Sequence, residues 1–202
     1  MQKKYNIAVV GATGNVGREI LQILEQRKFP IDNIFCLASA RSKGKKLDFN
    51  NEQVTVEDLS DFDFSNAHIG LFSPGSKVSE EYAPKASKNG CLVIDNTSHF
   101  RMHKDVPLVV PEVNGNVLHR FFENSNRSNI ISNPNCSTIQ MVMVLKPLHD
   151  LFKIKWVVVS TYQSTSGAGR QQMDELFQQT KDISQDHQSF NMVEVGFIKQ
   201  SS

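Results

Sequence analysis

The residue with the clearest capacity for chemistry is Cys136, in the stretch ISNPNCSTIQ that covers residues 131–140. It follows the turn-forming residues NPN and precedes an apolar run, which predicts a position at or near the N-terminus of a helix. There the helix dipole and the backbone N–H groups favour a thiolate, and the same N–H groups can stabilise the oxyanion formed when a thiolate attacks a carbonyl. From position alone, a nucleophile and a small hydrophobic residue both remain open.

The other two cysteines, Cys36 and Cys91, lie in apolar contexts typical of strands, so we expect them to be packed in the core. Three cysteines, with no pair at metal-ligand spacing, argue against a disulfide framework and indicate no metal site. This cysteine usage favours a reducing, cytoplasmic environment.

Composition and charge restrict the partners of the protein. Of its 202 residues, 39% are apolar and 21% are charged, the profile of a soluble globular protein. A net charge of +1 gives no electrostatic reason to expect binding to nucleic acid or to an acidic membrane. The apolar run in the N-terminal stretch MQKKYNIAVVG is too short for a signal peptide or a membrane span, so a cytosolic protein is expected.

A glycine-rich turn, GATGNVG, places glycines at positions 11, 14 and 17. Gly11 would allow a sharp turn after a strand, Gly14 would let backbone N–H groups approach a phosphate, and Gly17 would permit close helix–sheet packing. The turn follows a predicted strand and opens a predicted helix, whose N-terminus favours a pyrophosphate. The pattern therefore predicts a dinucleotide site, the alternative being a tight turn with only a structural role.

The segment LASARSKGKK, after the second predicted strand, indicates which dinucleotide would bind. An NAD site usually has Asp or Glu here to hold the ribose 2′-hydroxyl, and this segment contains neither. Ser39, Arg41 and Ser42 instead suit a 2′-phosphate, which an arginine can bind through paired hydrogen bonds. We therefore expect NADP rather than NAD. The lysines at positions 43, 45 and 46 are equally compatible with a solvated basic loop.

Strand and helix patterns alternate along the first part of the chain. Residues 7–10 are a continuous apolar run, typical of a strand buried on both faces of a parallel sheet. Apolar residues at helical spacing from Val16 through Ile20, Ile23 and Leu24 predict a helix with one apolar face. Further strands are predicted over residues 33–39, 67–73 and 91–98, and a helix over residues 74–90. This alternation predicts an α/β fold with a Rossmann-type, doubly wound parallel sheet.

The later part of the chain gives a less regular pattern. Residues 106–113 read as a short extended piece between prolines, and residues 138–152 as a mostly apolar, buried helix. The Val-rich residues 153–167 predict a strand and residues 168–183 an amphipathic helix, whereas residues 184–202 show no clear element. We therefore expect a second domain to begin shortly before the chain stops.

Six motifs together resemble the aspartate-semialdehyde dehydrogenase family: GATGNVG, ASARS, DNTSHFR, VPEVN, NPNCSTIQ and STYQSTSGAG, in the family's order. The resemblance covers about residues 4–180 and implies that Cys136 is the nucleophile. It implies reductive dephosphorylation of 4-phospho-L-aspartate by NADPH to L-aspartate 4-semialdehyde and phosphate, in lysine, threonine and methionine biosynthesis. The chemistry of a thiolate agrees, because it can displace phosphate from an acyl phosphate and leave a thioester.

The resemblance also assigns roles to individual residues and divides the chain. It implies a Rossmann-type NADP-binding domain over residues 1–133 and an incomplete α+β catalytic and dimerisation domain over residues 134–202, with a homodimer expected for the full-length family. The phosphate and substrate contacts it implies are Arg101, Asn135 and Gln163. The cofactor contacts are Thr13, Gly14, Asn15 and Val16 in the turn, Arg41 and Ser42 at the 2′-phosphate, and Ser166 and Gly167 near the nicotinamide.

The sequence also departs from the family pattern. A catalytic histidine, a substrate-binding arginine and further Glu and Lys residues lie in a part of the family enzyme that has no counterpart here. We therefore expect a truncated or frameshifted product, or a partial chain. A non-catalytic NADP-binding fragment is the first alternative, and an N-acetyl-glutamyl-phosphate reductase is the second.

Overall fold

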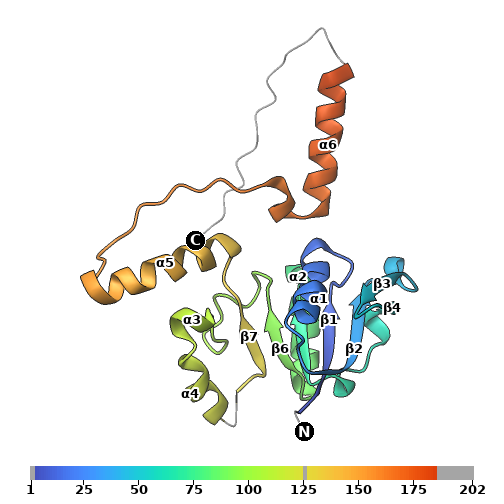
Figure 1. Ribbon diagram of the computed structural model, residues 1–202, viewed down its shortest axis with the longest axis horizontal. Helices are drawn as coiled ribbons and strands as arrows, with labels where there is room; N and C mark the ends of the chain where they lie inside the picture. The colour runs from blue at the N-terminus through green and yellow to red at the C-terminus, as the bar shows by residue number, and fades with distance from the viewer. Residues whose placement is uncertain (1–2, 125–126, 186–202) are drawn as a thin grey trace. The chain divides into compact units, whose positions relative to one another are not determined.

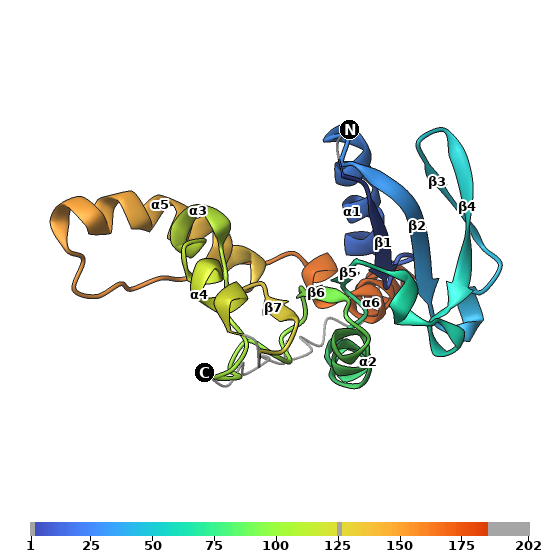
Figure 2. The ribbon, with the colours of Figure 1, turned by 90° about the horizontal axis from the view of Figure 1, so that it is seen from below.

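A seven-stranded sheet supports the first part of the protein, in the strand order β3-β4-β2-β1-β5-β6-β7 (Figures 1 and 2). The computed structural model describes residues 3–124 and 127–185. The chain divides into two units, residues 1–159 and 160–202. The strands are β1 (Tyr5–Val10), β2 (Ile31–Ala38), β3 (Lys46–Phe49), β4 (Glu52–Asp58), β5 (Ile69–Phe72), β6 (Leu92–Asp95) and β7 (Ile130–Ser132).

The predicted α/β fold is confirmed. Neighbouring strands of this sheet run parallel, with the exception of the antiparallel pair β3 and β4. The predicted helices correspond to α1 (Asn15–Gln26) and α2 (Ser76–Lys88). Strand β1 lies between β2 and β5, so the strand order reverses beside β1. In such sheets ligands bind outside the carboxyl ends of the strands at this reversal.

Successive residues of β1 pack on opposite faces of the sheet, as expected for a strand covered on both sides. Ile7 and Val9 belong to one buried cluster, together with Leu21 of α1. Ala8 and Val10 belong to the other cluster, which contains residues of α2. The two helices therefore cover opposite faces of the sheet (Figure 2).

The apolar face of α1 differs in detail from the prediction. Leu21 is its buried residue, and Ile20 and Leu24 pack partly buried against the same cluster. Val16 and Ile23, which the helical spacing also placed on this face, remain 46% and 39% exposed. Val16 lies in the first turn of α1, at the carboxyl edge of the sheet rather than over its centre.

The hairpin of β3 and β4 was not predicted, because its strands are mostly polar and exposed. Asn50 and Asn51 join the two strands and have φ angles of 50° and 64°. Positive φ at both central residues is what a two-residue type I′ hairpin turn requires, and asparagine tolerates it. The Asn-Asn pair is thus the sequence signal that could have identified the hairpin.

The segment after β6 is partly helical, which corrects the prediction of an extended piece over residues 106–113. Pro111 begins a short helix, α3 (Pro111–Asn114), because a proline at the first helical position sacrifices no helical hydrogen bond. Leu108 makes only an isolated bridge to Ser132. A further short helix, α4 (Val117–Glu123), follows and was not predicted.

Helix α5 (Cys136–Phe152) forms where a helix was predicted, but the prediction that it is buried is wrong. None of its residues is buried, and Val144, Leu151 and Phe152 are 64%, 74% and 75% exposed. The predicted strand over residues 153–167 is also wrong, since residues 153–164 have no regular secondary structure. A strand requires a hydrogen-bonding neighbour, and no described strand pairs with this segment.

The second unit contains a 3₁₀ turn, η4 (Thr165–Ala168), and α6 (Arg170–Gln185), which confirms the predicted amphipathic helix. The prediction of no clear element over residues 184–202 concerns mostly positions outside the described residues, which end at residue 185.

The close packing of Gly17 against the glycine turn can be tested by substitution. A Cβ at position 17 would lie 2.3 Å from the carbonyl oxygen of Gly11, closer than van der Waals contact allows. We expect Gly17→Ala to lower the free energy of unfolding by about 1–3 kcal/mol through overpacking. Gly14→Ala is the matched control, because its Cβ would lie 3.3 Å from the same oxygen and should cost much less. Urea unfolding followed by circular dichroism measures both, and equal losses would contradict this packing argument.

Candidate active site

The candidate site residues of the first unit follow the carboxyl ends of four parallel strands. The glycine turn follows β1, the segment with Arg41 follows β2, Arg101 follows β6 and Cys136 follows β7. Because parallel strands end at the same edge of a sheet, the fold brings these segments to one edge. Adjacent strands lie about 4.8 Å apart, so this edge spans the length of a dinucleotide and a small substrate.

The glycine turn packs tightly, as the sequence predicted. Gly11 has a φ of 83°, and a Cβ there would lie 2.8 Å from the carbonyl oxygen of Ser73, so only glycine fits without strain. The Gly11 N–H donates to the Leu37 carbonyl over 2.9 Å, which ties the turn to β2. Gly14 is the N-cap of α1 and makes no side-chain cap hydrogen bond, and Gly14, Asn15 and Val16 are exposed whereas Thr13 is half-buried. The N-terminus of α1 therefore faces solvent and suits an anion such as a pyrophosphate.

The segment after β2 forms a short 3₁₀ turn, η1 (Ala40–Ser42), with Ser39 as its N-cap. Arg41 and Ser39 are exposed and Ser42 is half-buried, which leaves the guanidinium accessible to a ligand. Lys43 instead pairs with Asp61, its Nζ lying 2.8 Å from the carboxylate, and this hydrogen bond raises the pKa of Lys43. Arg41 is thus the basic group of this turn best placed to bind a phosphate.

Cys136 is the first residue of α5 and is exposed, so the predicted position at a helix N-terminus is confirmed. Asn135 is the N-cap: its side-chain oxygen accepts hydrogen bonds from the N–H and the hydroxyl of Ser137, over 3.0 and 2.6 Å. The same oxygen accepts a weak hydrogen bond from the Cys136 sulfur over 3.8 Å. Because the Asn135 side chain already accepts the Ser137 N–H, this N–H is not available to an oxyanion. The sequence had led us to expect that the N–H groups at this helix N-terminus would stabilise one.

The cap also gives Asn135 a structural role, in addition to the phosphate or substrate contact that the resemblance implies. An asparagine before an apolar helix is a strong N-cap signal, and here it fixes both the start of α5 and the position of the sulfur.

Arg101 joins the turn after β6 to the loop before Cys136. Its Nε donates to the Asn133 carbonyl over 2.9 Å and its Nη2 to the Asn96 carbonyl over 3.2 Å. These bonds use two of the five guanidinium N–H groups, and the others bond to no other described residue. Burial lowers the pKa of Arg101, while the negative charges of Asp95 and of an ionised Cys136 raise it. The guanidinium is therefore held on the loop that leads to Cys136, and its remaining donors suit a phosphate.

Cys36 and Cys91 are fully buried, which confirms the predicted packing role. Burial raises the pKa of Cys36 to about 11 and that of Cys91 to about 12, because an apolar core disfavours a thiolate. Only Cys136 combines exposure with a helix N-terminus among the three cysteines.

The remaining predicted residues, Gln163, Ser166 and Gly167, belong to the second unit and are exposed. Within that unit they form a compact turn, in which a Cβ on Gly167 would lie 2.2 Å from Nε2 of Gln163. The hydroxyl of Ser166 lies 2.7 Å from that of Ser164. Glycine at position 167 is thus needed for the glutamine side chain to fold over this turn.

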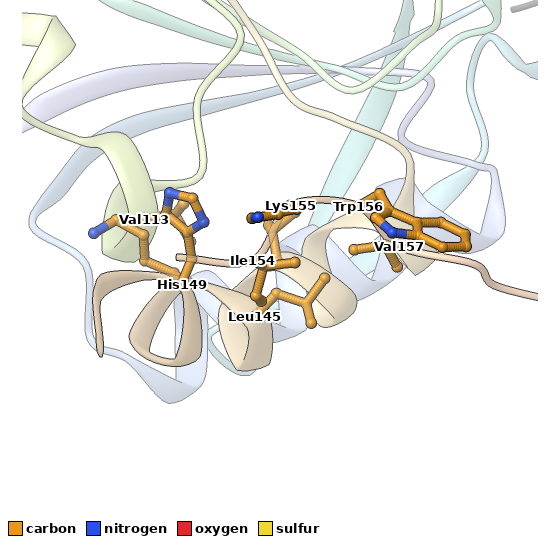
Figure 3. Close-up of a pocket in the computed structure, with 9 residues that line it drawn as sticks. Val113, Leu145, His149, Ile154, Lys155, Trp156 and Val157 are labelled. Carbon is orange, nitrogen blue, oxygen red and sulfur yellow. The ribbon is translucent and has the colours of Figure 1, made fainter. Parts of the chain in front are cut away.

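An apolar pocket of about 320 Å³ lies on another part of the first unit (Figure 3). Val113 of α3, Leu145 and His149 of α5, and Ile154 with Trp156 line it. It contains none of the predicted site residues, and it reflects the uncovered side of α5 rather than the chemistry at the edge of the sheet.

The described residues lack two further kinds of feature. Within residues 3–124 and 127–185, no three His, Cys, Asp or Glu side chains are arranged to hold a metal ion. No helix in these ranges has the length and apolar character needed to cross a membrane.

Comparisons with known proteins agree with the motifs. A family model described as "Semialdehyde dehydrogenase, NAD binding domain" matches residues 6–121, and one described as "Semialdehyde dehydrogenase, dimerisation domain" matches residues 145–200. The aspartate-semialdehyde dehydrogenase of Shewanella sp. strain DB6705 is 53% identical over 176 residues, which are 87% of this chain and 51% of the relative. The chain spans about half the length of the curated relatives it matches.

Solved structures of the same family also resemble this chain. The structure of aspartate semialdehyde dehydrogenase II from Vibrio cholerae complexed with ASA has a TM-score of 0.85 at 47% identity, covering 94% of this chain and 55% of that chain. The structure of the Candida albicans enzyme with NADP has a TM-score of 0.60 at 28% identity, covering 74% of this chain and 48% of that chain. The family predicted from the six motifs is thereby confirmed.

The burial of two of the three thiols gives a direct prediction. In the native chain at pH 8, iodoacetamide should modify Cys136 alone, because the thiolate is the reactive form and burial suppresses it at Cys36 and Cys91. Mass spectrometry should find a single adduct, and three after unfolding. The Cys136→Ser variant serves as the control and should take up no label in its native state. Native labelling of Cys36 or Cys91 would show that the core is more open than described.

Proposed function

The chain belongs to the semialdehyde dehydrogenase family, among the aspartate-semialdehyde dehydrogenases, and we propose that it carries the nucleophile and the nucleotide site of that enzyme. The reaction is the NADP-dependent, reversible reductive dephosphorylation of 4-phospho-L-aspartate to L-aspartate 4-semialdehyde and phosphate. Its setting is the cytoplasmic biosynthesis of lysine, threonine and methionine. The observation that carries the proposal is an exposed Cys136 at the N-terminus of α5, after a loop to which Arg101 is hydrogen-bonded at the Asn133 carbonyl.

In this reaction the Cys136 thiolate attacks the acyl carbon of the substrate. The C–S bond forms, the C–O bond to phosphate breaks, and inorganic phosphate leaves with its electron pair, so that a thioester remains on Cys136. When bound, NADPH supplies the hydride that reduces this thioester. The resulting thiohemiacetal collapses to the aldehyde and returns the electron pair to the sulfur.

Arg101 and Asn135 have distinct roles in this proposal. The unused donors of Arg101 bind the phosphate group, for which a planar guanidinium is well suited. Asn135 holds the sulfur in place as the helix cap, and contact with the substrate is a further role proposed for it. Gln163 is proposed to contact the substrate.

The cofactor proposed is NADP. The groups at the edge of the sheet fit it, because the exposed N-terminus of α1 suits a pyrophosphate and the exposed Arg41 suits a 2′-phosphate. The backbone of Thr13, Gly14, Asn15 and Val16 would hold the pyrophosphate, between the packing glycines 11 and 17, and Ser39, Arg41 and Ser42 the 2′-phosphate. Ser166 and Gly167 would lie near the nicotinamide. One solved relative, from Candida albicans, is described as a structure with NADP.

The division into an NADP-binding domain over residues 1–133 and the start of a catalytic and dimerisation domain over residues 134–202 is retained as part of this proposal. The match of residues 145–200 to a dimerisation domain supports a homodimer. Since the chain spans about half the length of its relatives, binding of NADP without turnover is the second candidate function.

Turnover in the direction of aldehyde oxidation tests the proposed reaction. We expect NADPH formation, followed at 340 nm, when the chain receives aspartate semialdehyde, phosphate and NADP. Cys136→Ser should abolish it and leave the Kd for NADP unchanged, since the sulfur acts in the chemical step. Cys91→Ala, which removes a buried thiol, is the matched control and should stay active.

The outcomes separate the candidates. An active Cys136→Ser variant would eliminate the thioester mechanism. NADP binding without NADPH formation in the unmodified chain would support the nucleotide-binding function instead. Turnover with N-acetyl-glutamate semialdehyde in place of aspartate semialdehyde would indicate an N-acetyl-glutamyl-phosphate reductase.

The choice of cofactor is tested at Arg41. Arg41→Ala should raise the Kd for NADP about 10- to 100-fold, the loss expected for charged hydrogen bonds to a phosphate, with the Kd for NAD nearly unchanged. Lys43→Ala is the control, because Lys43 pairs with Asp61 and should contribute little. Isothermal titration calorimetry measures these constants, and an equal effect of Arg41→Ala on both nucleotides would argue against a 2′-phosphate site.

A further inference from the structure

A polar groove lies between helix α1 and the edge strand β3, apart from the candidate active site. Parallel strands are usually joined by a crossover helix, whereas the connection from β2 to β4 consists of the turn η1 and β3. A strand rather than a second helix is therefore the neighbour of α1 here. The groove has a volume of about 360 Å³, within the range of about 300–1,000 Å³ that small-molecule sites occupy.

Two leucines form the apolar floor of this groove. Leu21 of α1 is 3% exposed, and Leu47 of β3 packs half-buried against the same core cluster. A ligand in the groove would contact these two side chains with an aliphatic part, and burial of that part would favour binding.

The α1 wall of the groove carries three polar side chains, those of Arg18, Gln22 and Glu25. They follow one another at positions i, i+4 and i+7, which lie on one face of a helix. Arg18 and Gln22 are exposed and Glu25 is half-buried. Among the described residues, Arg18 and Glu25 form no ion pair within 4.0 Å. Both charges are therefore open to a ligand.

The β3 wall contributes Lys46 and Asp48. Successive residues of a strand point to opposite faces, so these two residues border the groove beside Leu47 and are not part of its floor. The Nζ of Lys46 also donates to the hydroxyl of Thr55 on β4. The charged side chains of α1 are thus the ones best placed to bind a ligand.

Positive and negative charges are separated along the groove. Helix α1 runs away from the carboxyl edge of the sheet, and so does β3, because it is antiparallel to β4. On both elements the cation comes first and the acid second, Arg18 before Glu25 and Lys46 before Asp48. At about 1.5 Å per residue, Arg18 and Glu25 lie about 10 Å apart along the helix axis. One end of the groove is therefore positive and the other negative.

We propose that this groove binds an elongated zwitterion. Arg18 binds its carboxylate through paired hydrogen bonds, Glu25 binds its ammonium group, and the aliphatic middle of the ligand lies on Leu21 and Leu47. The groove contains none of the residues proposed to hold NADP or the substrate. This binding site is therefore additional to the proposed function and does not depend on it.

The probe for this site is 6-aminohexanoate, an unbranched aliphatic chain with a carboxylate at one end and an ammonium group at the other. Isothermal titration calorimetry with the full chain should show saturable binding, with a Kd of about 1 mM or lower. Hexanoate and hexylamine, which each lack one charged end, should bind at least about 10-fold more weakly. Saturating NADP should leave the Kd of the probe unchanged, because the two sites share no residue.

Substitutions assign the two ends of the ligand. Arg18→Gln and Glu25→Gln should each raise the Kd of 6-aminohexanoate at least about 10-fold. Arg18→Gln should leave the weak binding of hexylamine unchanged, and Glu25→Gln that of hexanoate. The matched controls are Glu19→Gln and Arg27→Gln, at exposed positions on α1 and at its C-cap that do not line the groove. Neither control should change the Kd.

Three results would overturn the proposal: no saturable binding of the probe, displacement of the probe by NADP, or equal effects of the lining and the control substitutions. All four substitutions are at the surface, where changes in stability are usually small, and circular dichroism confirms folding. Binding requires no turnover, so an inactive chain leaves the test intact. Failure of the probe to bind would, in turn, leave the proposed reaction at Cys136 untouched.

Discussion

The parallel pairing of β6 with β7 is the constraint on which the candidate site depends. It places Asp95 beside Ser132 at the last position of both strands, so that the chain leaves the sheet there in two adjacent loops. One loop carries Arg101 and the other carries Cys136, and hydrogen bonds at Asn133 join them. A guanidinium and a thiol that are 35 positions apart in the sequence thereby lie on adjacent loops.

The same edge of the sheet explains why the glycine turn tolerates no side chains at two of its positions. Gly11 turns against the backbone that follows β5, and Gly17 packs against the carbonyl of Gly11. These contacts draw the first turn of α1 down to the carboxyl edge, where its N-terminus remains exposed. Close packing beneath the turn and an exposed helix N-terminus above it are thus two results of one backbone arrangement.

Helix α5 is well fixed at its N-terminus but poorly covered along the rest of its length. Its N-terminus is fixed by Asn135, whereas its apolar side chains and those of the following Val-rich segment are largely exposed. Exposed apolar surface of this extent is typical of a face that packs against further protein. The chain spans about half the length of its relatives, and the match to a dimerisation domain begins within α5, at residue 145. Local capping can therefore order Cys136 even where the helix behind it is not covered.

Local patterns in the sequence were sufficient for the alternating strands and helices of the sheet, for the glycine turn, for the burial of Cys36 and Cys91 and for the helix that begins at Cys136. Each depends on periodicity or on backbone chemistry within a few residues, which a sequence displays directly. They failed for the Val-rich segment after α5, because β-propensity produces a strand only where a neighbouring strand supplies hydrogen bonds. They also gave no reason to single out Asp95, an acidic residue within the strand predicted over residues 91–98. Only the tertiary structure buried its carboxylate and connected this residue to Arg101 and to the loop before Cys136, since the pairing of β6 with β7 is a long-range contact that no local pattern encodes.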